Sequence, residues 1–294
     1  MSTTLTLTSA PELAWWRSRV VRRFLSHRLA VLGLVMITLL SLACAFGPYL
    51  LPFDSLQIDL FARFAPPLAG DHYLGADSLG RDLAARLLMA GRISLLVGFF
   101  SMLLATFVGT LVGVIAGYMG GWVNTVLMRT VDGFLSFPTL FLLLALAVAL
   151  KPSPIMITII ISLTSWMTVA RIVATEVATL KEREFVLAGR MLGLSRAHIM
   201  FREILPNAMG PIIVAATLTV ARAILLEAYI SYLGFGIQPP LPSWGNMLNG
   251  AQQYLDRAPW LAIIPGLAIT MAVTSFNLIG DGLRDALDIR SEHK

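Results

Sequence analysis

Long runs without a charged residue constrain the fold of this chain more than any other feature. No Asp, Glu, Lys or Arg lies between Arg28 and Asp54, or between Arg92 and Arg129, and further runs follow. A helix of about 20 apolar residues crosses the roughly 30 Å hydrocarbon core of a bilayer and satisfies its own backbone polar groups there. The runs therefore predict an all-α membrane protein with six transmembrane helices, near residues 29–51, 93–117, 131–150, 154–176, 207–232 and 259–281.

The composition agrees with this class. Charged residues make up 13% of the 294 residues and hydrophobic residues 57%, whereas a soluble domain carries about 25% charged residues because water covers its surface. The single cysteine, Cys44, excludes an intrachain disulfide. The net charge of +5 comes mainly from arginines spread along the chain, without a compact basic patch. We therefore predict contact with membrane lipid and no nucleic-acid partner.

The distribution of Lys and Arg predicts the orientation. These residues are concentrated before the first span and between the fourth and fifth spans. Because cytoplasmic loops carry an excess of Lys and Arg, we expect a multi-pass protein of a bacterial inner membrane with both termini in the cytosol. The expected organisation is a cytosolic tail (1–28), a transmembrane domain (29–282) and a second cytosolic tail (283–294). Within the domain, loops 52–91 and 233–258 are expected to be extracytoplasmic, and loop 182–206 cytosolic.

Four glycines recur at every fourth position in and after the second predicted span: Gly109, Gly113, Gly117 and Gly121. Glycines at this spacing share one face of a helix and let two helix backbones approach closely. They are compatible with tight packing inside the subunit or with a seam between two subunits. We expect packing inside the subunit.

The sequence contains no motif of an enzyme or a metal site that we can identify. No lysine follows a glycine, so the chain lacks a standard P-loop for ATP. Its histidines form no H-E-x-x-H zinc motif, and no G-x-S-x-G nucleophile elbow occurs. We therefore predict a protein that is not an enzyme, with no catalytic residue, no metal site and no cofactor in this chain.

The loop between the fourth and fifth spans has the most informative local pattern. Gly193 predicts the end of a short helix, because glycine readily adopts the positive φ found after a helix C-terminus. Ser195 is a suitable N-cap for a second short helix. Pro206 suits the first turn of the fifth span. The loop is thus predicted to be two short helices with a break between them.

This loop also has the composition of a docking surface. Phe185, Met191 and Leu192 are apolar residues in a segment otherwise dense in charge, and such a patch favours contact with another protein. Ala188 and Gly189 are small, so they would allow a partner to approach the backbone.

The same loop resembles the EAA loop of ATP-binding-cassette (ABC) importer permeases. Glu184, Ala188, Gly189 and Gly193 have the spacing of that loop, and Ile204-Leu205-Pro206 follows. Other segments make the chain similar to the dipeptide, oligopeptide and nickel permease family, the branch typified by the DppC and OppC subunits. These segments are 72–82, 92–95, 120–122, 128–132, 137–138, 227, 233–236, 239–240, 243–245 and 276–285, so the resemblance covers about residues 20–290.

The resemblance implies a type I ABC importer permease fold and a function in import. The chain would be the transmembrane permease subunit that moves di- or oligopeptides, or a related small solute, into the cytosol. Its implied partners are a second permease subunit, two ATPase subunits that hold ATP and Mg, and an extracytoplasmic solute-binding protein. Import of nickel or another metal chelate is an alternative, and an ion-coupled secondary transporter is an alternative of another class.

The resemblance also implies which residues couple this chain to the ATPase subunits. They belong to the EAA loop: Glu184, Phe185, Ala188, Gly189, Met191, Leu192, Gly193, Ile204, Leu205 and Pro206.

Three ionisable residues fall near or within predicted spans. Arg171 is close enough to the cytosolic loop for its side chain to reach the interface. Arg222 and Glu227 are about 140° apart around a helix, so they are poorly placed to pair. We consider both as candidates for the pathway or its gating, with Glu227 the stronger. A structural hydrogen-bonding role for Glu227 is equally compatible with the sequence.

The first extracytoplasmic loop carries a motif that contains Asp77, Gly80, Arg81 and Asp82. The spacing of Asp77 and Arg81 allows an ion pair within a short helical turn, and an exposed pair contributes only a few tenths of a kcal/mol. We expect residues 72–82 to form an ordered element over the extracytoplasmic mouth, in contact with the partner permease or the solute-binding protein. A self-contained loop without partner contact is the alternative.

Overall fold

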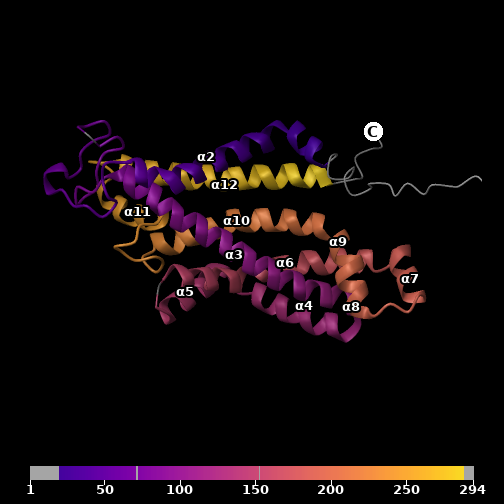
Figure 1. Ribbon diagram of the computed structural model, residues 1–294. Helices are drawn as coiled ribbons and strands as arrows, with labels where there is room; N and C mark the ends of the chain where they lie inside the picture. Colours follow the sequence, from indigo (N-terminus) through magenta and orange to yellow (C-terminus); the bar gives the residue numbers. More distant parts are fainter. Residues whose placement is uncertain (1–19, 71, 152, 288–294) are drawn as a thin grey trace, which may run out of the picture.

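The computed structural model describes residues 20–70, 72–151 and 153–287, and helices form the regular structure of these ranges (Figure 1). The longer helices are α2 (Arg28–Leu50), α3 (Leu83–Met119), α4 (Gly121–Leu135), α5 (Thr139–Ala149), α6 (Pro154–Leu180), α10 (Met209–Tyr232) and α12 (Trp260–Leu287). Shorter ones are α7 (Glu184–Met191), α8 (Arg196–His198), α9 (Leu205–Asn207) and α11 (Trp244–Ala251), and a π-helix (Ile199–Ile204) joins α8 to α9. The outer parts of the two predicted tails, 1–19 and 288–294, lie outside the described residues.

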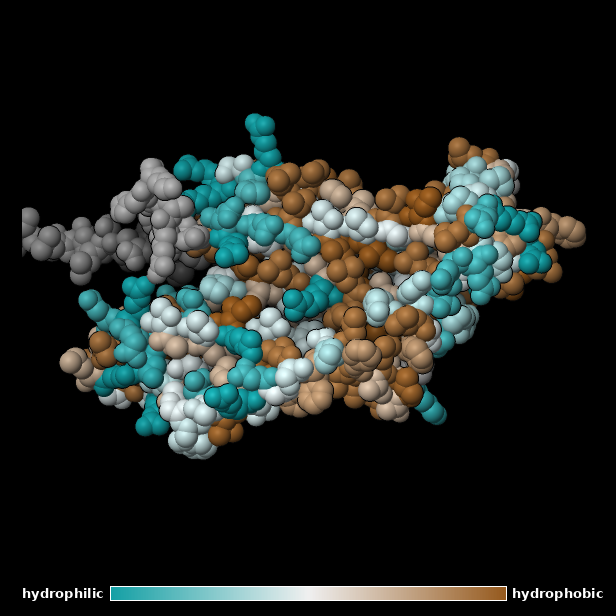
Figure 2. Space-filling model, turned by 180° about the vertical axis from the view of Figure 1, so that it is seen from behind, coloured by the Kyte–Doolittle hydropathy of each residue, from teal (hydrophilic) through white to brown (hydrophobic). Residues whose placement is uncertain are grey.

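The long helices run roughly side by side, so the molecule has two ends (Figure 1). One end, which we call the α7 end, contains α7, the start of α2 and the end of α12. The opposite α11 end contains α11 and the loop between α2 and α3, residues 51–82, which we call the first loop. On the face in Figure 2, hydrophilic residues gather at both ends, and the middle is mainly hydrophobic. A membrane-spanning bundle requires this distribution.

By length and composition, five helices in the described part of the chain can cross a membrane, and the bent pair of α4 and α5 supplies a sixth. The prediction of six spans is therefore confirmed, but the third span is not one helix over 131–150. It begins at Gly121, and its two helices are bent by 82° at the break between Leu135 and Thr139. Pro138 explains the break, because proline lacks the N–H of the helix ladder and disfavours helical dihedrals at Phe137.

Besides α4, several helices extend beyond the predicted spans, α3 and α12 most of all. The helix predicted from residue 93 begins at Leu83 and so takes up the end of the predicted loop 52–91. Asp82 caps this start, since its Oδ1 accepts a hydrogen bond from Ala85 N at 2.8 Å. α12 continues to Leu287 and enters the predicted tail 283–294. An uncharged run marks only the segment that hydrocarbon tolerates, and a capped helix continues past it into water.

The glycine stripe packs α3 against α6 within the subunit. A Cβ atom at Gly109, Gly113 or Gly117 would lie 2.5–2.7 Å from a backbone carbonyl oxygen of α6. The two backbones are therefore closer than any larger residue would allow. Gly121 does not continue the stripe, because it starts α4 with a φ of +51 and has no atom within 4 Å of its Cβ position. The expected packing inside the subunit is confirmed for the first three glycines.

Two glycines also let α12 pack between α2 and α10. A Cβ atom at Gly282 would lie 2.2 Å from Ala30 Cβ on α2. A Cβ atom at Gly280 would lie 3.0 Å from Leu218 Cδ2 and 3.1 Å from Thr217 Oγ1 on α10. α10 and α12 run in opposite directions (Figure 1), so the contact at Gly280 defines which residues of the two helices stand at the same height.

Gly113→Ala should destabilise the subunit, because the new Cβ would lie 2.6 Å from Val173 Cβ and 2.7 Å from Ala170 O. Such overpacking costs about 1–3 kcal/mol, so we expect a lower melting temperature of the detergent-purified protein. Gly133→Ala in α4 is the matched control, since no atom lies within 4 Å of that Cβ position. It should be neutral or stabilise the helix by up to about 1 kcal/mol. Equal melting temperatures of the two variants would contradict the close contact of α3 and α6.

Candidate functional site

At the α7 end, the loop between α6 and α10 folds into two helical segments. α7 ends at Met191, and Gly193 follows with a φ of +76. Leu194 N then donates to Gly189 O at 3.1 Å, which closes the helix end. Ser195 caps the second segment, because its Oγ accepts a hydrogen bond from His198 N of α8 at 3.2 Å. The predicted break at Gly193 and the predicted cap at Ser195 are confirmed, and Pro206 lies in the first turn of α9, directly before α10.

α7 is attached to the subunit and also exposes apolar surface. Val186 is fully buried, and the Arg190 guanidinium lies 5.5 Å from the centroid of the Tyr118 ring on α3. In contrast, Met191 and Leu192 are 90% and 80% exposed. Two adjacent apolar side chains in water at the tip of an ordered helix are typical of a surface that another protein covers.

The residues predicted for coupling do not all face outward. Leu205 is partly buried, and Ile204 is fully buried in a cluster with Val186 and Ile199. Gly189 is buried too, and its Cβ position lies 3.4 Å from Leu194 Cδ1. The interpretation that Gly189 lets a partner approach is therefore wrong, since its own chain covers it. The exposed members of the set are Glu184, Phe185, Ala188, Met191, Leu192, Gly193 and Pro206.

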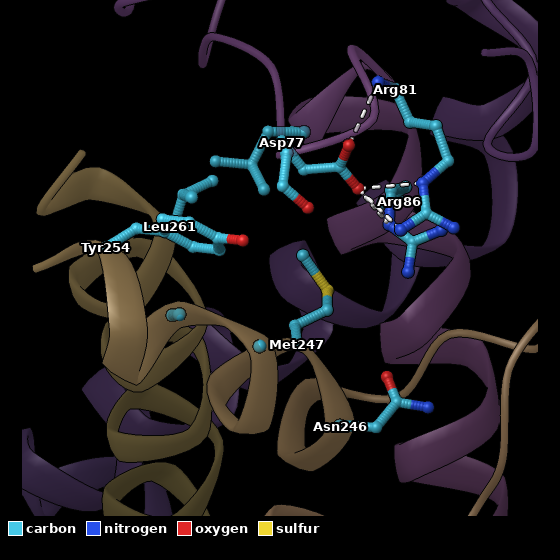
Figure 3. A pocket seen from close by; sticks show the side chains of 11 residues that line it. Asp77, Arg81, Arg86, Asn246, Met247, Tyr254 and Leu261 are labelled. Carbon is cyan, nitrogen blue, oxygen red and sulfur yellow. Dashed lines mark hydrogen bonds and ion pairs between the residues drawn. The ribbon is translucent and has the colours of Figure 1, made fainter. Parts of the chain in front are cut away.

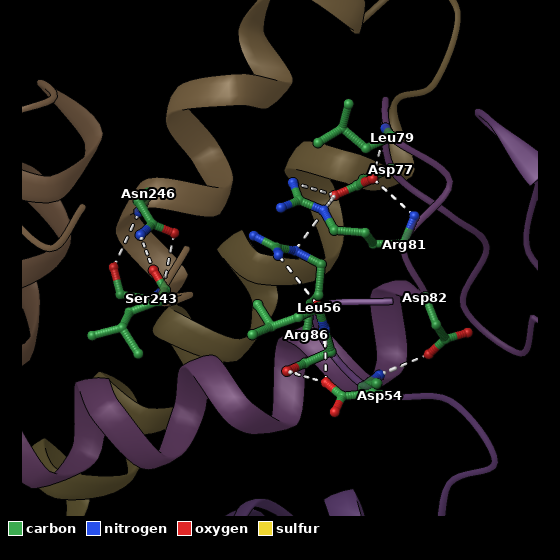
Figure 4. Close-up of polar contacts among 12 residues, drawn as sticks. Asp54, Leu56, Asp77, Leu79, Arg81, Asp82, Arg86, Ser243 and Asn246 are labelled. Carbon is green, nitrogen blue, oxygen red and sulfur yellow. Dashed lines mark hydrogen bonds and ion pairs between the residues drawn. The ribbon is translucent and has the colours of Figure 1, made fainter. Parts of the chain in front are cut away.

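At the α11 end, Asp77 organises the first loop (Figure 4). Its Oδ1 accepts from the backbone N of Leu79 at 2.8 Å and of Arg81 at 3.0 Å. Its Oδ2 accepts from Arg81 Nε at 2.7 Å and lies 3.4 Å from Arg86 Nε. The predicted pair of Asp77 and Arg81 is present, but not in a helical turn, because Gly80 N donates to Asp77 O at 3.0 Å and closes a β-turn.

The sequence led us to expect an exposed ion pair, but the structure buries it. The side chains of Asp77 and Arg81 are only 12% and 18% exposed. A second guanidinium, Arg86, shares the carboxylate and is itself buried. Removing one member of such a pair leaves a buried charge without its partner, so breaking this network costs far more than breaking a surface pair.

Asp82 and Gly80 connect the first loop to the rest of the chain. Asp82 Oδ2 lies 2.8 Å from His72 Nδ1, while its other oxygen caps α3. Gly80 has a φ of +74, and a Cβ atom there would lie 1.6 Å from Asp59 O. The predicted motif thus builds an ordered loop, and the side chains of Asp77 and Asp82 are bonded within the chain.

A cavity of about 80 Å³ lies between this loop and α11 and α12 (Figure 3). It holds a few water molecules at most, so it is too small for a peptide. Its polar wall comes from the first loop and α3, and its apolar wall from α11, α12 and the turn between them: Asp77, Arg81 and Arg86 face Met247, Tyr254 and Leu261.

Glu227 is fully buried and bound by serine hydroxyls. Ser94 Oγ on α3 donates to its Oε2 at 2.8 Å, and Ser231 Oγ donates to its Oε1 at 2.7 Å. The backbone N of Trp244 donates to Ser94 Oγ at 3.3 Å. The carboxyl group therefore joins α3, α10 and α11, and the hypothesis that it lines a pathway is wrong for this conformation.

The partners of Glu227 were missed by sequence reasoning. Ser94 and Trp244 both lie in segments that carried the family resemblance, 92–95 and 243–245. That coincidence is the signal that would have found them. The motif residues of three distant segments meet around one buried carboxyl group.

The two intramembrane arginines have different surroundings. Arg171 on α6 is exposed and forms an ion pair with Asp132 on α4. Arg222 on α10 is exposed, and its guanidinium has no hydrogen bond or ion pair among the described residues. The prediction that Arg222 does not pair with Glu227 is confirmed. Because an arginine at the centre of a helix in hydrocarbon costs about 2.5–3.5 kcal/mol on insertion scales, Arg222 is not expected to face lipid.

Comparison with known proteins extends over nearly the whole chain. Residues 109–293 match the family described as the binding-protein-dependent transport system inner membrane component, and residues 15–67 match the N-terminal TM domain of oligopeptide transport permease C. A Brucella ovis protein is 43% identical over 97% of this chain and 94% of its own length. The dipeptide transport system permease protein DppC of Alkalihalophilus pseudofirmus is 39% identical over 93% of this chain and 89% of its own. The oligopeptide transport system permease protein OppC of Bacillus subtilis is 39% identical over 95% and 91%.

Gly80→Ala should disorder the first loop, whereas Gly70→Ala should not. Both glycines have a positive φ, +74 and +60, so each variant carries a conformational penalty of about 1–2 kcal/mol. Only the Cβ at Gly80 would meet another atom, Asp59 O at 1.6 Å, while Gly70 has none within 4 Å. We expect trypsin to cleave Gly80→Ala after Arg81 much faster than wild type, and Gly70→Ala at nearly the wild-type rate. Equal cleavage of both variants would show that this contact does not hold the loop.

Proposed function

The chain belongs to the family of inner membrane components of binding-protein-dependent transport systems, and we propose that it is the permease subunit of an ATP-driven peptide importer. As a permease it moves a solute across the membrane and is not an enzyme. Peptides are favoured as the solute because relatives named dipeptide and oligopeptide permeases are 39% identical over more than nine-tenths of this chain. Neither metal-chelate import nor ion-coupled transport has comparable support.

Import of this kind requires partners that this chain does not contain. We assign to the complex a second permease subunit, two ATPase subunits that hold ATP and Mg, and an extracytoplasmic solute-binding protein. The family description, which names a binding-protein-dependent system, supports the last of these. The contribution of this chain is a coupling free energy between the ATP sites and the solute path.

The exposed tip of α7 supports docking onto an ATPase subunit, and it is the observation that carries the coupling proposal. Met191 and Leu192 are almost fully in water, and covering them with a partner surface contributes roughly 25 cal/mol per Å² of apolar area. The burial of Val186 and the stacking of Arg190 on Tyr118 join α7 to α3. A displacement of α7 by the ATPase is therefore passed to the membrane helices.

The α7 end is proposed to lie in the cytosol. Its cations exceed those of the loops at the other end, which is the asymmetry that cytoplasmic loops show. With this orientation, residues 1–28 and 283–294 are cytosolic tails of the transmembrane domain 29–282, and the first loop and α11 face the solute-binding protein. The cations of the α6–α10 loop are Lys181, Arg183, Arg190, Arg196 and Arg202.

Cysteines placed at Gln57 and Ala197 should react with an impermeant thiol reagent from opposite sides of the membrane. Gln57 is exposed in the first loop and Ala197 is exposed on α8, and Cys44→Ser removes the one native cysteine and serves as the blank. In cells with a permeabilised outer envelope and an intact inner membrane, we expect Gln57→Cys alone to be labelled. Disrupting the inner membrane should add Ala197→Cys. Labelling of Ala197→Cys while the inner membrane is intact would contradict the proposed orientation.

Leu192→Asp should release the ATPase subunits. The leucine is 80% exposed and its replacement removes little contact inside the subunit, so the chain should still fold and insert. An interface hot spot contributes about 2 kcal/mol or more, so we expect ATPase affinity to fall by at least about 30-fold, with loss of co-purification and of solute-stimulated ATP hydrolysis. Phe61→Asp, at a fully exposed position of the first loop, should retain both. Wild-type behaviour of Leu192→Asp would refute docking at α7.

A further inference from the structure

Two neighbouring helices expose stripes that carry polar groups within the membrane-spanning bundle. On α12 the exposed positions recur every three or four residues and therefore form one face, and the part of this face toward the α7 end is polar. Its members are Thr270, Thr274, Asn277, Asp281 and Arg284. On α10 the exposed face contains Leu218, Arg222, Leu225 and Tyr229. Arg222 is thus the one charged residue on the exposed face of α10.

The contact at Gly280 places the centres of these two faces at the same height. Leu218 Cδ2 lies 3.0 Å from the Cβ position of Gly280. One turn from Leu218 toward the α11 end is Arg222, and about one turn from Gly280 in the same direction is Asn277. Leu218, which touches α12, belongs to the same exposed face as Arg222, so Arg222 lies beside α12 near the level of Asn277.

In the described part of the chain, these groups make no hydrogen bond to a neighbouring helix. The Arg222 guanidinium and the Asn277 amide make no hydrogen bond there, and the Thr270 hydroxyl donates only to Gly266 O of its own helix, at 2.9 Å. In contrast, Glu227 and Arg171 are each satisfied by a neighbouring helix. A charge and an amide without partners inside a span face water or another polar molecule, because lipid offers no hydrogen bonds.

We propose that Arg222, Asn277, Thr274 and Thr270, which we call the polar strip, line a water-filled solute path, and that Arg222 binds the terminal carboxylate of a peptide in transit. The proposal rests on the peptide-import function. A guanidinium presents N–H donors in a planar arrangement that matches the two oxygens of a carboxylate. The Asn277 amide both donates and accepts hydrogen bonds, as a peptide group requires. Such a site recognises the terminal carboxylate and the peptide groups, which all linear peptides share, and it does not discriminate between their side chains.

The first test compares a peptide that has a free C-terminal carboxylate with its amidated form. Both are imported by the complete importer in proteoliposomes, and the pair is chosen so that the solute-binding protein binds the two forms equally. A hydrogen-bonded charge pair corresponds to a preference of about tenfold or more, so we expect wild type to import the free-carboxylate form at least about tenfold faster. Arg222→Gln should reduce this ratio to near one, and Arg222→Lys should retain part of it.

Arg171→Gln is the matched control, because it removes an arginine that is already paired with Asp132, and it should keep the wild-type ratio. A wild-type ratio near one, or an unchanged preference in Arg222→Gln, would overturn the inference and leave peptide import standing. Failure of wild type to import either form would overturn the proposed function itself.

A second test measures whether water reaches the polar strip, and it does not depend on the preference for free-carboxylate peptides. In a Cys44→Ser background, Asn277→Cys and Thr274→Cys should react with a charged thiol reagent during ATP turnover, and peptide should slow the reaction. Phe107→Cys, at a position on α3 that is 70% exposed and apolar, should remain unreactive in lipid. If the two strip positions are as unreactive as Phe107→Cys, another protein surface covers them, and the solute-path assignment is overturned.

Discussion

A polar group inside hydrocarbon needs a hydrogen-bond partner or water, and the arrangement of this subunit follows from that requirement. Glu227 is accommodated because hydroxyls from two helices reach both of its oxygens. Arg171 is accommodated because Asp132 stands on the neighbouring helix. Arg222 has no such neighbour among the described residues. The pattern of satisfied and unsatisfied groups therefore separates the parts of the subunit that are complete from the parts that need a partner or a solute.

Both ends of the molecule expose apolar surface. At the α11 end, the charges of Asp77, Arg81 and Arg86 are paired within the chain, while apolar side chains such as Phe61 and Leu68 are exposed. At the α7 end, Met191 and Leu192 remain in water. Apolar surface of this kind is typical of a face that another protein covers.

The number of spans was predictable because the cost of charge in lipid acts directly on composition. Pro138 was a signal for the break in the third span. The uncharged residues on either side of this proline do not reveal the angle between α4 and α5. The pairing of Asp77 with Arg81 followed from spacing, while its burial depends on α11 and α12, which are distant in sequence. Ser94 and Glu227 are separated by 133 residues, so only tertiary packing brings them together. The inward position of Gly189 depends on the direction in which the chain turns at Gly193, and that direction is set by Ile199 and Leu194.

The position of the Glu227 cross-link along α10 has a mechanical consequence. The link to α3 and α11 holds α10 near one end and divides the helix into two unequal arms. At 1.5 Å per residue, the arm from Glu227 to Met209 is about 27 Å and the arm to Tyr232 is about 8 Å. If α10 turns as a rigid rod about this pivot, its α7 end travels roughly three times as far as its α11 end. Force applied at the long arm is then amplified at the short one, where the displacement is small.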